Sequence, residues 1–479
     1  GCLVGVGAMA RVEGRSRRRC GKKRDFPAAG GRDEDAFPVK IVISGYYGFG
    51  NAGDEAILEA MVRDLRALAP GARLVVLSAD PAATAARCGV EAVPRMHLPS
   101  VLGALRGADL FISGGGSLLQ DATSWRSVPY YAGLMRLARW MGVPVFVYAQ
   151  GIGPLRRPWL RRLAARALNG AAEVTVRDRL SYEMLLELGV DPAAVTITAD
   201  PVFALAPGAP EPVATAAASP DPAAAGAAAS GGAPAGPAAS GGPAVSAGRR
   251  GDALGPQGGR LIGLCLRPVP GPDGDAATNR VLDALAAALR LRLDEWDAYV
   301  VPLPLHPAAD GPVLEGLRRK LAARGAASRV VEPEDLFRAA DGPPVGESRA
   351  SGRVGAPTAG AVEWIHRFSR LDLCITMRLH GLILAACAGT PFVALSDDPK
   401  VAAHVDELGL PRESCLIGAE AAAAHTLGSV LERAWRNRTN QVKRLHDAVP
   451  ELAARARLTA VRALGRAGFP GRNGLALSN

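Results

Sequence analysis

Residues 39–55 read VKIVISGYYGFGNAGDE and contain the pattern that decides the fold. An apolar run of strand length ends at Ser44, a glycine-rich turn follows it, and a helical stretch begins near Asp54. Parallel strands are joined through long connections that are usually helices, so strand, turn and helix in this order form half of a crossover unit. The stretch therefore predicts the first strand of a parallel sheet.

The same alternation repeats over two parts of the chain, residues 38–206 and 260–425. We expect an α/β fold in which each part forms a Rossmann-like domain, with a cleft between the two. Helices are expected over residues 426–479, with a break at Pro450. Ligands of open parallel sheets bind beyond the carboxyl ends of the strands, so the functional residues should lie in the turns that follow strands.

Three segments lack this alternation. Residues 1–37 are basic and show no hydrophobic periodicity, which predicts a disordered tail. Residues 207–259 consist largely of Ala, Gly, Pro and Ser and predict a low-complexity linker. Residues 341–360 predict a loose loop within the second domain.

The positive net charge of the chain indicates which classes of ligand and surface it can bind. Lys and Arg exceed Asp and Glu by 10, and residues 1–37, with nine basic and five acidic residues, supply +4 of that excess. An excess of this size suits anionic small substrates or the anionic surface of the inner membrane. No stretch interleaves the cations with aromatic rings, so we expect no nucleic-acid partner.

Cysteine spacing and hydropathy argue against a zinc protein and against a membrane-spanning protein. The seven cysteines contain no Cys-x-x-Cys pair, which argues against a zinc site and indicates a reducing, cytoplasmic compartment. No cluster of His, Cys and carboxylates indicates a metal, so we expect neither a metal nor a cofactor. No apolar run reaches the ~18 to 20 residues that a membrane-spanning helix needs. Any membrane contact is therefore expected to be peripheral, on the cytoplasmic face.

Two glycine-rich turns predict anion-binding sites. The first contains Asn51 and Asp54, and the N–H groups at the start of the following helix can hold an anion. The second contains Gly115, Gly116 and Ser117, whose successive backbone N–H groups form a nest. The alternatives are that Asp54 only caps its helix and that the second segment is only a tight turn with a Ser cap.

Three cations and a histidine follow other predicted strands. Arg177 closes one apolar strand, Arg378 and His380 follow another, and Lys400 comes after a third. Arg binds carboxylate or phosphate through two parallel hydrogen bonds. Histidine titrates near neutral pH, as general acid–base catalysis requires. The pattern predicts an anion site with a proton donor beside it.

Each of these four residues also has a structural alternative. Arg177 can pair with Asp178 or Asp200 and act only in folding. His380 can be a core histidine with satisfied hydrogen bonds, and Lys400 can be an ordinary solvated lysine.

The order of these motifs resembles that of the polysaccharide pyruvyl transferases, and most closely the CsaB type. The motifs are GYYGFGNAGDE, GGGSLLQD, AQGIGP, VRDxxS, ADP, MRLHG and DPKV, which lie between about residues 39 and 409. The resemblance implies a two-Rossmann fold similar to that of GT-B glycosyltransferases. It also implies transfer of a pyruvyl group from phosphoenolpyruvate, the donor substrate, to a sugar diol with release of phosphate.

The CsaB resemblance implies a more specific product, a 4,6-ketal on β-linked N-acetylmannosamine in a lipid-linked precursor of secondary cell wall polysaccharide. That product is the ligand of S-layer homology domains, so the implied role is cell wall biogenesis and S-layer anchoring. Carried over residue by residue, the resemblance implies Arg177, Arg378 and Lys400 as ligands of phosphoenolpyruvate. It implies His380 as the acid/base, with Leu379 among the residues that line the cleft.

Two other functions are compatible with the sequence. A GT-B glycosyltransferase that uses a nucleotide sugar fits the same two-domain outline. A non-catalytic binder of wall polymer or nucleic acid would use the basic tail.

Overall fold

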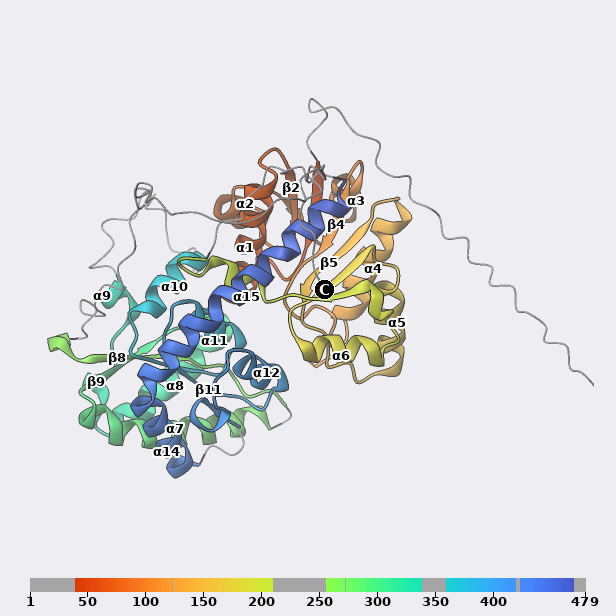
Figure 1. Cartoon of the computed structure of the whole chain (residues 1–479). Coiled ribbons are helices and arrows are strands. Elements are labelled where there is room, and N and C mark those ends of the chain that lie inside the picture. The colour runs from red at the N-terminus through yellow and green to blue at the C-terminus, as the bar shows by residue number, and fades with distance from the viewer. Residues whose placement is uncertain are drawn as a thin grey trace, which may run out of the picture. The chain divides into compact units, whose positions relative to one another are not determined.

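Figure 1 shows the computed structural model of the chain. It describes residues 39–122, 124–209, 256–271, 273–337, 359–418 and 423–468. The expected tail, residues 210–255 of the expected linker and residues 341–358 of the expected loop lie outside the described residues.

The first sheet has seven parallel strands in the order β3-β2-β1-β4-β5-β6-β7. The strand order reverses between β1 and β4, and ligands of such sheets bind beyond the strand ends at this reversal. The strands are β1 (Lys40–Ser44), β2 (Arg73–Ser78), β3 (Glu91–Pro94), β4 (Leu110–Ser113), β5 (Val145–Gln150), β6 (Glu173–Val176) and β7 (Val195–Ile197).

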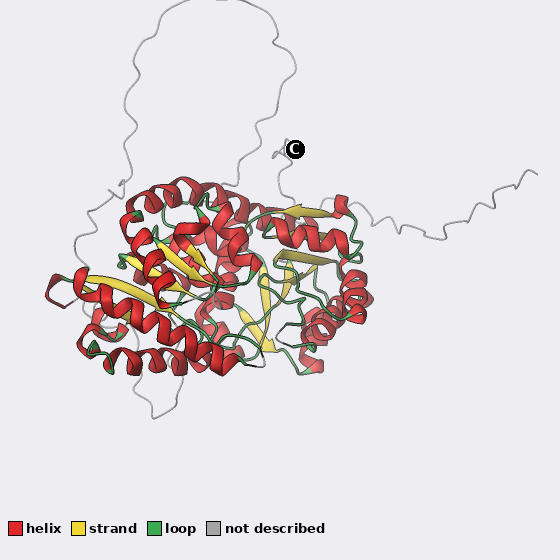
Figure 2. Cartoon of the chain, turned by 90° about the horizontal axis from the view of Figure 1, so that it is seen from below, coloured by secondary structure: helices red, strands yellow, loops and turns green. Residues whose placement is uncertain are grey.

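Helices cover both faces of this sheet, as the burial of β1 shows (Figure 2). Ile41 and Ile43 pack into one hydrophobic core, and Val42 packs into a second core on the opposite face. Successive strand residues point to opposite faces, so a strand that is buried throughout needs a layer on each side. The helices are α1 (Ala52–Leu68), α2 (Pro81–Cys88), α3 (Leu98–Leu105), α4 (Ser127–Trp140), α5 (Pro158–Leu168) and α6 (Arg179–Glu187), with short 3₁₀ helices η1 (Pro192–Ala194) and η2 (Pro201–Leu205).

The second sheet has five parallel strands in the order β12-β11-β10-β8-β9, which reverses between β8 and β10. Its strands are β8 (Arg260–Cys265), β9 (Ala298–Pro302), β10 (Leu373–Thr376), β11 (Phe392–Leu395) and β12 (Leu416–Ile417). Its helical elements are η3 (Pro256–Gly258), α7 (Gly274–Glu295), α8 (Pro307–Ala322), η4 (Ala327–Arg329), α9 (Pro333–Phe337), α10 (Ala361–Ser369), α11 (Leu379–Cys387), α12 (Pro399–Glu407) and α13 (Arg412–Cys415). Two parallel sheets with helical layers confirm the predicted α/β fold class.

The C-terminal helices correct one expectation. The predicted break at Pro450 is wrong: the helices are interrupted at Asn437, between α14 (Ala424–Arg436) and α15 (Arg438–Arg466), and α15 continues through Pro450. A proline inside a helix costs about 3 kcal/mol, mainly through one lost hydrogen bond and a clash with the preceding turn. Val449 and Leu452 are buried on either side of Pro450, and their packing offsets that cost.

The long helix α15 returns to the first sheet, as Figure 1 shows. Arg455 Nη2 donates to the Thr198 carbonyl at 2.6 Å, and Arg457 Nη2 donates to the Ala204 carbonyl at 3.0 Å. Arg466 Nε pairs with Glu173 in β6 at 2.7 Å. The last described helix therefore fixes the segment that follows β7. None of the described helices is long and apolar enough to cross a membrane.

Candidate active site

The predicted site residues come from turns at the carboxyl ends of strands in both sheets. Asn51 and Asp54 start α1 after β1, and Gly115–Ser117 follow β4. In the second sheet, Arg378–His380 lie at the start of α11 directly after β10. The two remaining cations, Arg177 after β6 and Lys400 in α12 after β11, complete the set.

The hydroxyl of Ser117 joins two of the predicted cations. Lys400 Nζ donates to Ser117 Oγ at 3.1 Å, and Arg177 Nη2 donates to the same oxygen at 3.3 Å. Lys400 Nζ also donates to the carbonyl of Gly153 in the turn after β5. Residues 117, 177 and 400 thus meet at one point, although they are far apart in the chain.

Both cations are nearly inaccessible to solvent, with 2% of Arg177 and 6% of Lys400 exposed. Burial, followed by the charge of Arg177, lowers the pKa of Lys400 to about 8. Lys400 therefore remains mostly protonated at neutral pH. Among the described residues it forms an ion pair with no carboxylate, so its charge is available to a ligand.

Arg177 forms the ion pair with aspartate that the sequence allowed as an alternative to a ligand-binding role. Its Nη1 lies 2.8 Å from Asp200 Oδ2, and its Nε lies 3.5 Å from Asp178 Oδ2. Asp200 also accepts a hydrogen bond from Val202 N and caps η2. A ligand that contacts Arg177 would therefore share this guanidinium with Asp200.

His380 faces the same aspartate. Its Nε2 lies 3.6 Å from Asp200 Oδ2, just beyond hydrogen-bond distance, and has no hydrogen-bond partner among the described residues. Burial acts to raise the pKa of Asp200, but His380 and the charge of Arg177 outweigh it and hold that pKa well below its usual value. Asp200 therefore stays ionised beside His380.

Gly53, the second residue of α1, lies directly against the imidazole of His380. A Cβ at Gly53 would lie 2.2 Å from His380 Nδ1. Real contacts are never this short, so only glycine fits between the helix backbone and the ring. The glycine-rich turn after β1 thus positions the candidate catalytic histidine.

The start of α1 is less free to bind an anion than its sequence suggests. Ala52 N donates to the Leu305 carbonyl at 2.7 Å, and Gly53 N donates to Asn51 Oδ1 at 3.3 Å. These two amide groups are already paired. In the second turn Gly116 forms a parallel β-bridge with Gln150, and the Ser117 hydroxyl contacts Lys400. This contact with a buried cation makes the second turn the better candidate for anion binding.

Asp54 is a second titratable group in this cluster. Burial raises its pKa to about 6, although the nearby charge of His380 acts in the opposite direction. The Asn51 amide donates to its carboxylate. A Cβ at Gly116, where φ is +85°, would lie 2.8 Å from Asp54 Oδ1, so the nest turn packs closely against this carboxylate. Asp54 exchanges its proton in a pH range useful for catalysis.

Arg378 is held by a carboxylate that the sequence reasoning missed. Both its Nε and its Nη2 donate to Asp310 in α8, and the Nε contact measures 2.7 Å. Among the described contacts, none joins Arg378 to Arg177 or Lys400. Leu379 packs at the edge of the hydrophobic core. The structure thus brings His380, Arg177 and Lys400 together through Asp200 and Ser117, whereas the described contacts of the Arg378 side chain are with Asp310.

A sequence model of the polysaccharide pyruvyl transferase family matches residues 51–241 and 279–399. The chain belongs to this family. The match confirms the family that the motif order indicated, while the CsaB type stays a prediction, and it spans most of the site described above. Lys400 directly follows the last residue matched in this transferase. No curated protein matches the sequence.

Solved structures support the fold of this transferase. A Listeria monocytogenes protein described as a UDP-N-acetylglucosamine 2-epimerase matches with a TM-score of 0.53 and 13% identity, over 89% of this chain and 95% of that one. The UDP complex of S. aureus MnaA matches with a TM-score of 0.50 and 10% identity, over 86% and 92%. At these identities the likeness shows the fold alone, and it confirms the expected two-Rossmann, GT-B-like arrangement.

Sequence reasoning about this transferase missed two carboxylates. Asp200 lies in the quoted ADP motif, but it was considered only as a structural partner of Arg177. Asp310 lies four residues after His306 at the start of a helix and accepts from His306 N at 2.9 Å, so in the sequence it looks like an ordinary helix cap. Its pairing with Arg378 across 68 residues carries no local signal.

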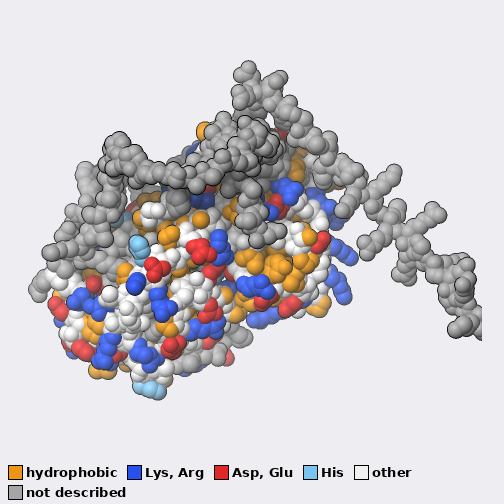
Figure 3. Space-filling model, viewed as in Figure 1, with side chains coloured by type: hydrophobic (Ala, Val, Ile, Leu, Met, Phe, Trp, Pro, Cys, Tyr) orange, Lys and Arg blue, Asp and Glu red, His pale blue; other side chains and the backbone are white. Residues whose placement is uncertain are grey.

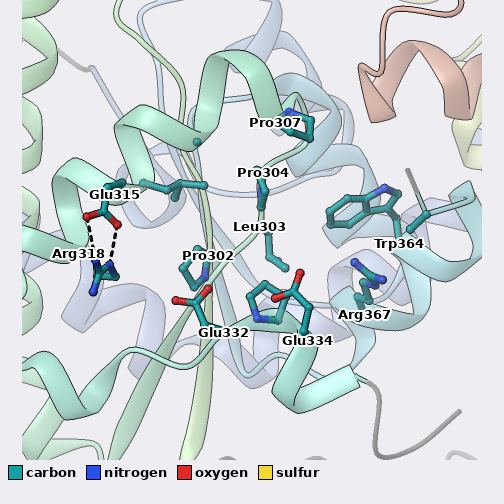
Figure 4. A pocket seen from close by; sticks show the side chains of 14 residues that line it. Pro302, Leu303, Pro304, Pro307, Glu315, Arg318, Glu332, Glu334, Trp364 and Arg367 are labelled. Carbon is teal, nitrogen blue, oxygen red and sulfur yellow. Dashed lines mark hydrogen bonds and ion pairs between the residues drawn. The ribbon is translucent and has the colours of Figure 1, made fainter. Parts of the chain in front are cut away.

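A cavity of about 390 Å³ lies elsewhere in the second sheet's part of the transferase (Figure 4). Figure 4 shows Trp364 and Arg367 on one side of it and the ion pair of Glu315 with Arg318 on the other. Pro304 lies between them. None of the predicted site residues lines this cavity. Within the described residues, no group of three His, Cys, Asp or Glu side chains could hold a metal ion.

Proposed function

We propose that this chain transfers the pyruvyl group of phosphoenolpyruvate to two hydroxyls of one sugar and releases phosphate. Membership of the pyruvyl transferase family supports the reaction class. The observation that carries the choice of donor is the convergence of Lys400 and Arg177 on the hydroxyl of Ser117.

Phosphoenolpyruvate carries a carboxylate and a phosphate and needs a compact set of cations and N–H donors. Lys400 supplies a buried positive charge without an ion-pair partner among the described residues. Gly115–Ser117 supply backbone amides beside it. Arg177 and Arg378 each retain N–H groups beyond those that bind Asp200 and Asp310, because a guanidinium has five. The donor would thus bind where Ser117 and Lys400 now contact each other.

The reaction requires two bond-forming steps. In the first, one sugar hydroxyl adds to the substituted carbon of the enol, its oxygen bonding to that carbon while the methylene carbon gains a proton. In the second, the other hydroxyl bonds to the same carbon, the bond from that carbon to the phosphate oxygen breaks, and phosphate leaves. One hydroxyl proton replaces the proton given to carbon, and the other leaves with phosphate or solvent. Ketal formation therefore neither consumes nor releases water.

His380 and Asp54 suit the two proton transfers. His380 Nε2 lies 3.6 Å from Asp200 Oδ2 and has no hydrogen-bond partner among the described residues, so it is the candidate donor of the proton to the methylene carbon. Asp54, with a pKa of about 6, is mostly ionised at neutral pH and is the candidate acceptor of the hydroxyl proton. Gly53 directly precedes Asp54 in the chain and lies against the His380 ring, where it leaves no room for a larger side chain.

For the acceptor we propose the CsaB-type substrate, a β-linked N-acetylmannosamine unit of a lipid-linked precursor of secondary cell wall polysaccharide. The product would carry a 4,6-ketal and serve as a ligand for S-layer homology domains. The order of the seven sequence motifs supports this acceptor.

The test is release of inorganic phosphate from phosphoenolpyruvate, with and without a synthetic β-N-acetylmannosaminyl acceptor. We expect acceptor-dependent release and a product heavier by one ketal-linked pyruvate in mass spectrometry. Thermal shift provides an independent measurement, because a ligand that binds only the folded state raises the melting temperature. Stabilisation by a uridine nucleotide but not by phosphoenolpyruvate, with no phosphate release, would contradict the proposal and favour a nucleotide-sugar reaction.

A further inference from the structure

Residues 122–172 contain eight arginines and neither aspartate nor glutamate. They form α4, β5, α5 and the turns around them, and α4 packs against α5. We call the outer surface of these two helices and of the turns before them the Arg–Trp face. Its arginines are Arg126, Arg136, Arg139, Arg156, Arg157, Arg161, Arg162 and Arg166.

Three tryptophans of this segment are exposed. The exposed fractions are 45% for Trp125, 81% for Trp140 and 47% for Trp159. Trp125 and Trp159 meet edge to face with ring centroids 6.0 Å apart, which joins the turn before α4 to the start of α5. A large aromatic side chain gains free energy when it leaves water, so the exposed Trp125–Trp159 pair, with Trp140 exposed at the other end of α4, indicates a surface that is covered in function.

Most of the arginines lack a carboxylate partner. Arg157 pairs with Asp121 at 3.4 Å, and Arg161 pairs with Glu187 at 3.5 Å. The other six are exposed and form no ion pair within the described residues. Figure 3 shows Lys and Arg side chains along the margin that α4 and α5 occupy in Figure 1, with hydrophobic side chains between them. The face therefore has unbalanced positive charge beside exposed rings.

The Arg–Trp face adjoins the candidate active site. Asp121, four residues after Ser117, accepts hydrogen bonds from the backbone N–H groups of Arg156 and Arg157 at 2.9 and 3.0 Å. Gly153, three residues before Arg156, accepts from Lys400. The turns that carry the anion nest and the Lys400 contact thus continue directly into this face.

We propose that the Arg–Trp face docks the protein on an anionic lipid bilayer, which presents the lipid-linked acceptor to the adjoining active site. The inference rests on the proposed function, because docking on a bilayer brings the active site to its acceptor only if that acceptor is anchored in the bilayer. Arginine pairs with lipid phosphates, and tryptophan favours the boundary between headgroups and acyl chains. The guanidinium of Arg126 lies over the Trp125 ring, 5.6 Å from its centroid, so this segment interleaves cations with aromatic rings, contrary to the expectation from the sequence. Single-stranded nucleic acid can also bind such a surface, and the lipid-linked acceptor of the proposed function favours a bilayer instead.

The test measures partitioning of the full chain onto vesicles of phosphatidylcholine, with or without phosphatidylglycerol. The variant is Trp159→Ser/Arg162→Glu on α5. Its matched control is Leu291→Ser/Arg280→Glu on α7, which also removes one exposed hydrophobic side chain and reverses one exposed arginine. We expect the protein to bind only the anionic vesicles, the α5 variant to bind at least about tenfold more weakly, and the control to bind as wild type does.

Turnover separates this inference from the proposed function. With a water-soluble acceptor, both variants should release phosphate at the wild-type rate, whereas with a lipid-linked acceptor in vesicles only the α5 variant should be slow. Equal binding to neutral and anionic vesicles would overturn the inference even if phosphate release is normal. The inference would also be overturned if the α5 variant and the control lose vesicle binding equally. It would likewise be overturned if the α5 variant loses affinity for an oligonucleotide and not for vesicles. Binding of the protein to anionic vesicles without any phosphate release would refute the proposed reaction but not the docking surface.

Discussion

Replacing Asp54 by asparagine would keep the shape of the side chain and remove its charge. Burial raises the pKa of Asp54 from its ordinary 3.8 to about 6. At about 1.4 kcal/mol per pH unit, the folded protein gives up about 3 kcal/mol to keep this carboxylate ionised. Asparagine avoids that loss, and its oxygen can still accept from the Asn51 amide.

The sign of the pH dependence follows from proton binding. The folded protein binds the Asp54 proton more tightly than the unfolded chain does, so its free energy of unfolding falls as pH rises from about 4 to about 6. About 1.3 kcal/mol of this loss lies between pH 5 and pH 7. Since Asp54→Asn has no such proton, its free energy of unfolding should gain about 1.3 kcal/mol relative to wild type over that interval.

Urea unfolding at pH 5, 6 and 7, followed by circular dichroism, measures this difference. Asp80→Asn, at the exposed start of α2, serves as the reference for removing a carboxylate at a helix start. The same preparations are assayed for phosphate release, where loss of a proton acceptor predicts about a hundredfold lower turnover. A stability difference that does not change with pH would refute the burial argument. Full turnover would remove Asp54 from the proton transfers.

Three further predictions follow from the site. His380→Ala should lower turnover by about 10²-fold or more, while His97→Ala, at an exposed position, should not; a turnover of His380→Ala close to wild type would remove the residue from catalysis. Gly53→Ala should lower turnover and the melting temperature together, because its methyl group would overlap the His380 ring; wild-type values of both would show that the ring has space to move. Lys400 loses its charge above pH 8, so kcat/KM for the donor should fall there with a midpoint near its pKa of about 8; a profile unchanged in Lys400→Met would assign that fall to another group.

Local sequence patterns predict the strands and the turns well, because apolar runs and glycine-rich turns act within a few residues. Strand β1 and the nest after β4 are found where the sequence indicates them. Contacts between segments far apart in the chain could not be predicted from these local patterns. The meeting of Ser117 with Lys400, and of Arg378 with Asp310, depends on how separate strand ends are brought together, and no spacing in the chain encodes it.

The failure at Pro450 has a similar origin. Proline weakens an isolated helix, and sequence reasoning weighs only that local effect. In the folded protein, burial of Val449 and Leu452 determines the outcome instead. The same reasoning explains Arg177: its local sequence allowed both an ion pair and a ligand role, and only the structure shows the position of Asp200.

The return of α15 to the first sheet supports the proposed site with residues far along the chain from it. The family match ends at residue 399, and the proposed catalytic and donor-binding residues end at Lys400. Yet Arg455 and Arg457 hold the backbone at Thr198 and Ala204, on either side of Asp200. A shortened protein that stops after α14 would keep every proposed catalytic side chain and lose the support that positions its central carboxylate. The structural support of the proposed site therefore extends to the end of α15, well beyond the residues that the family model matches.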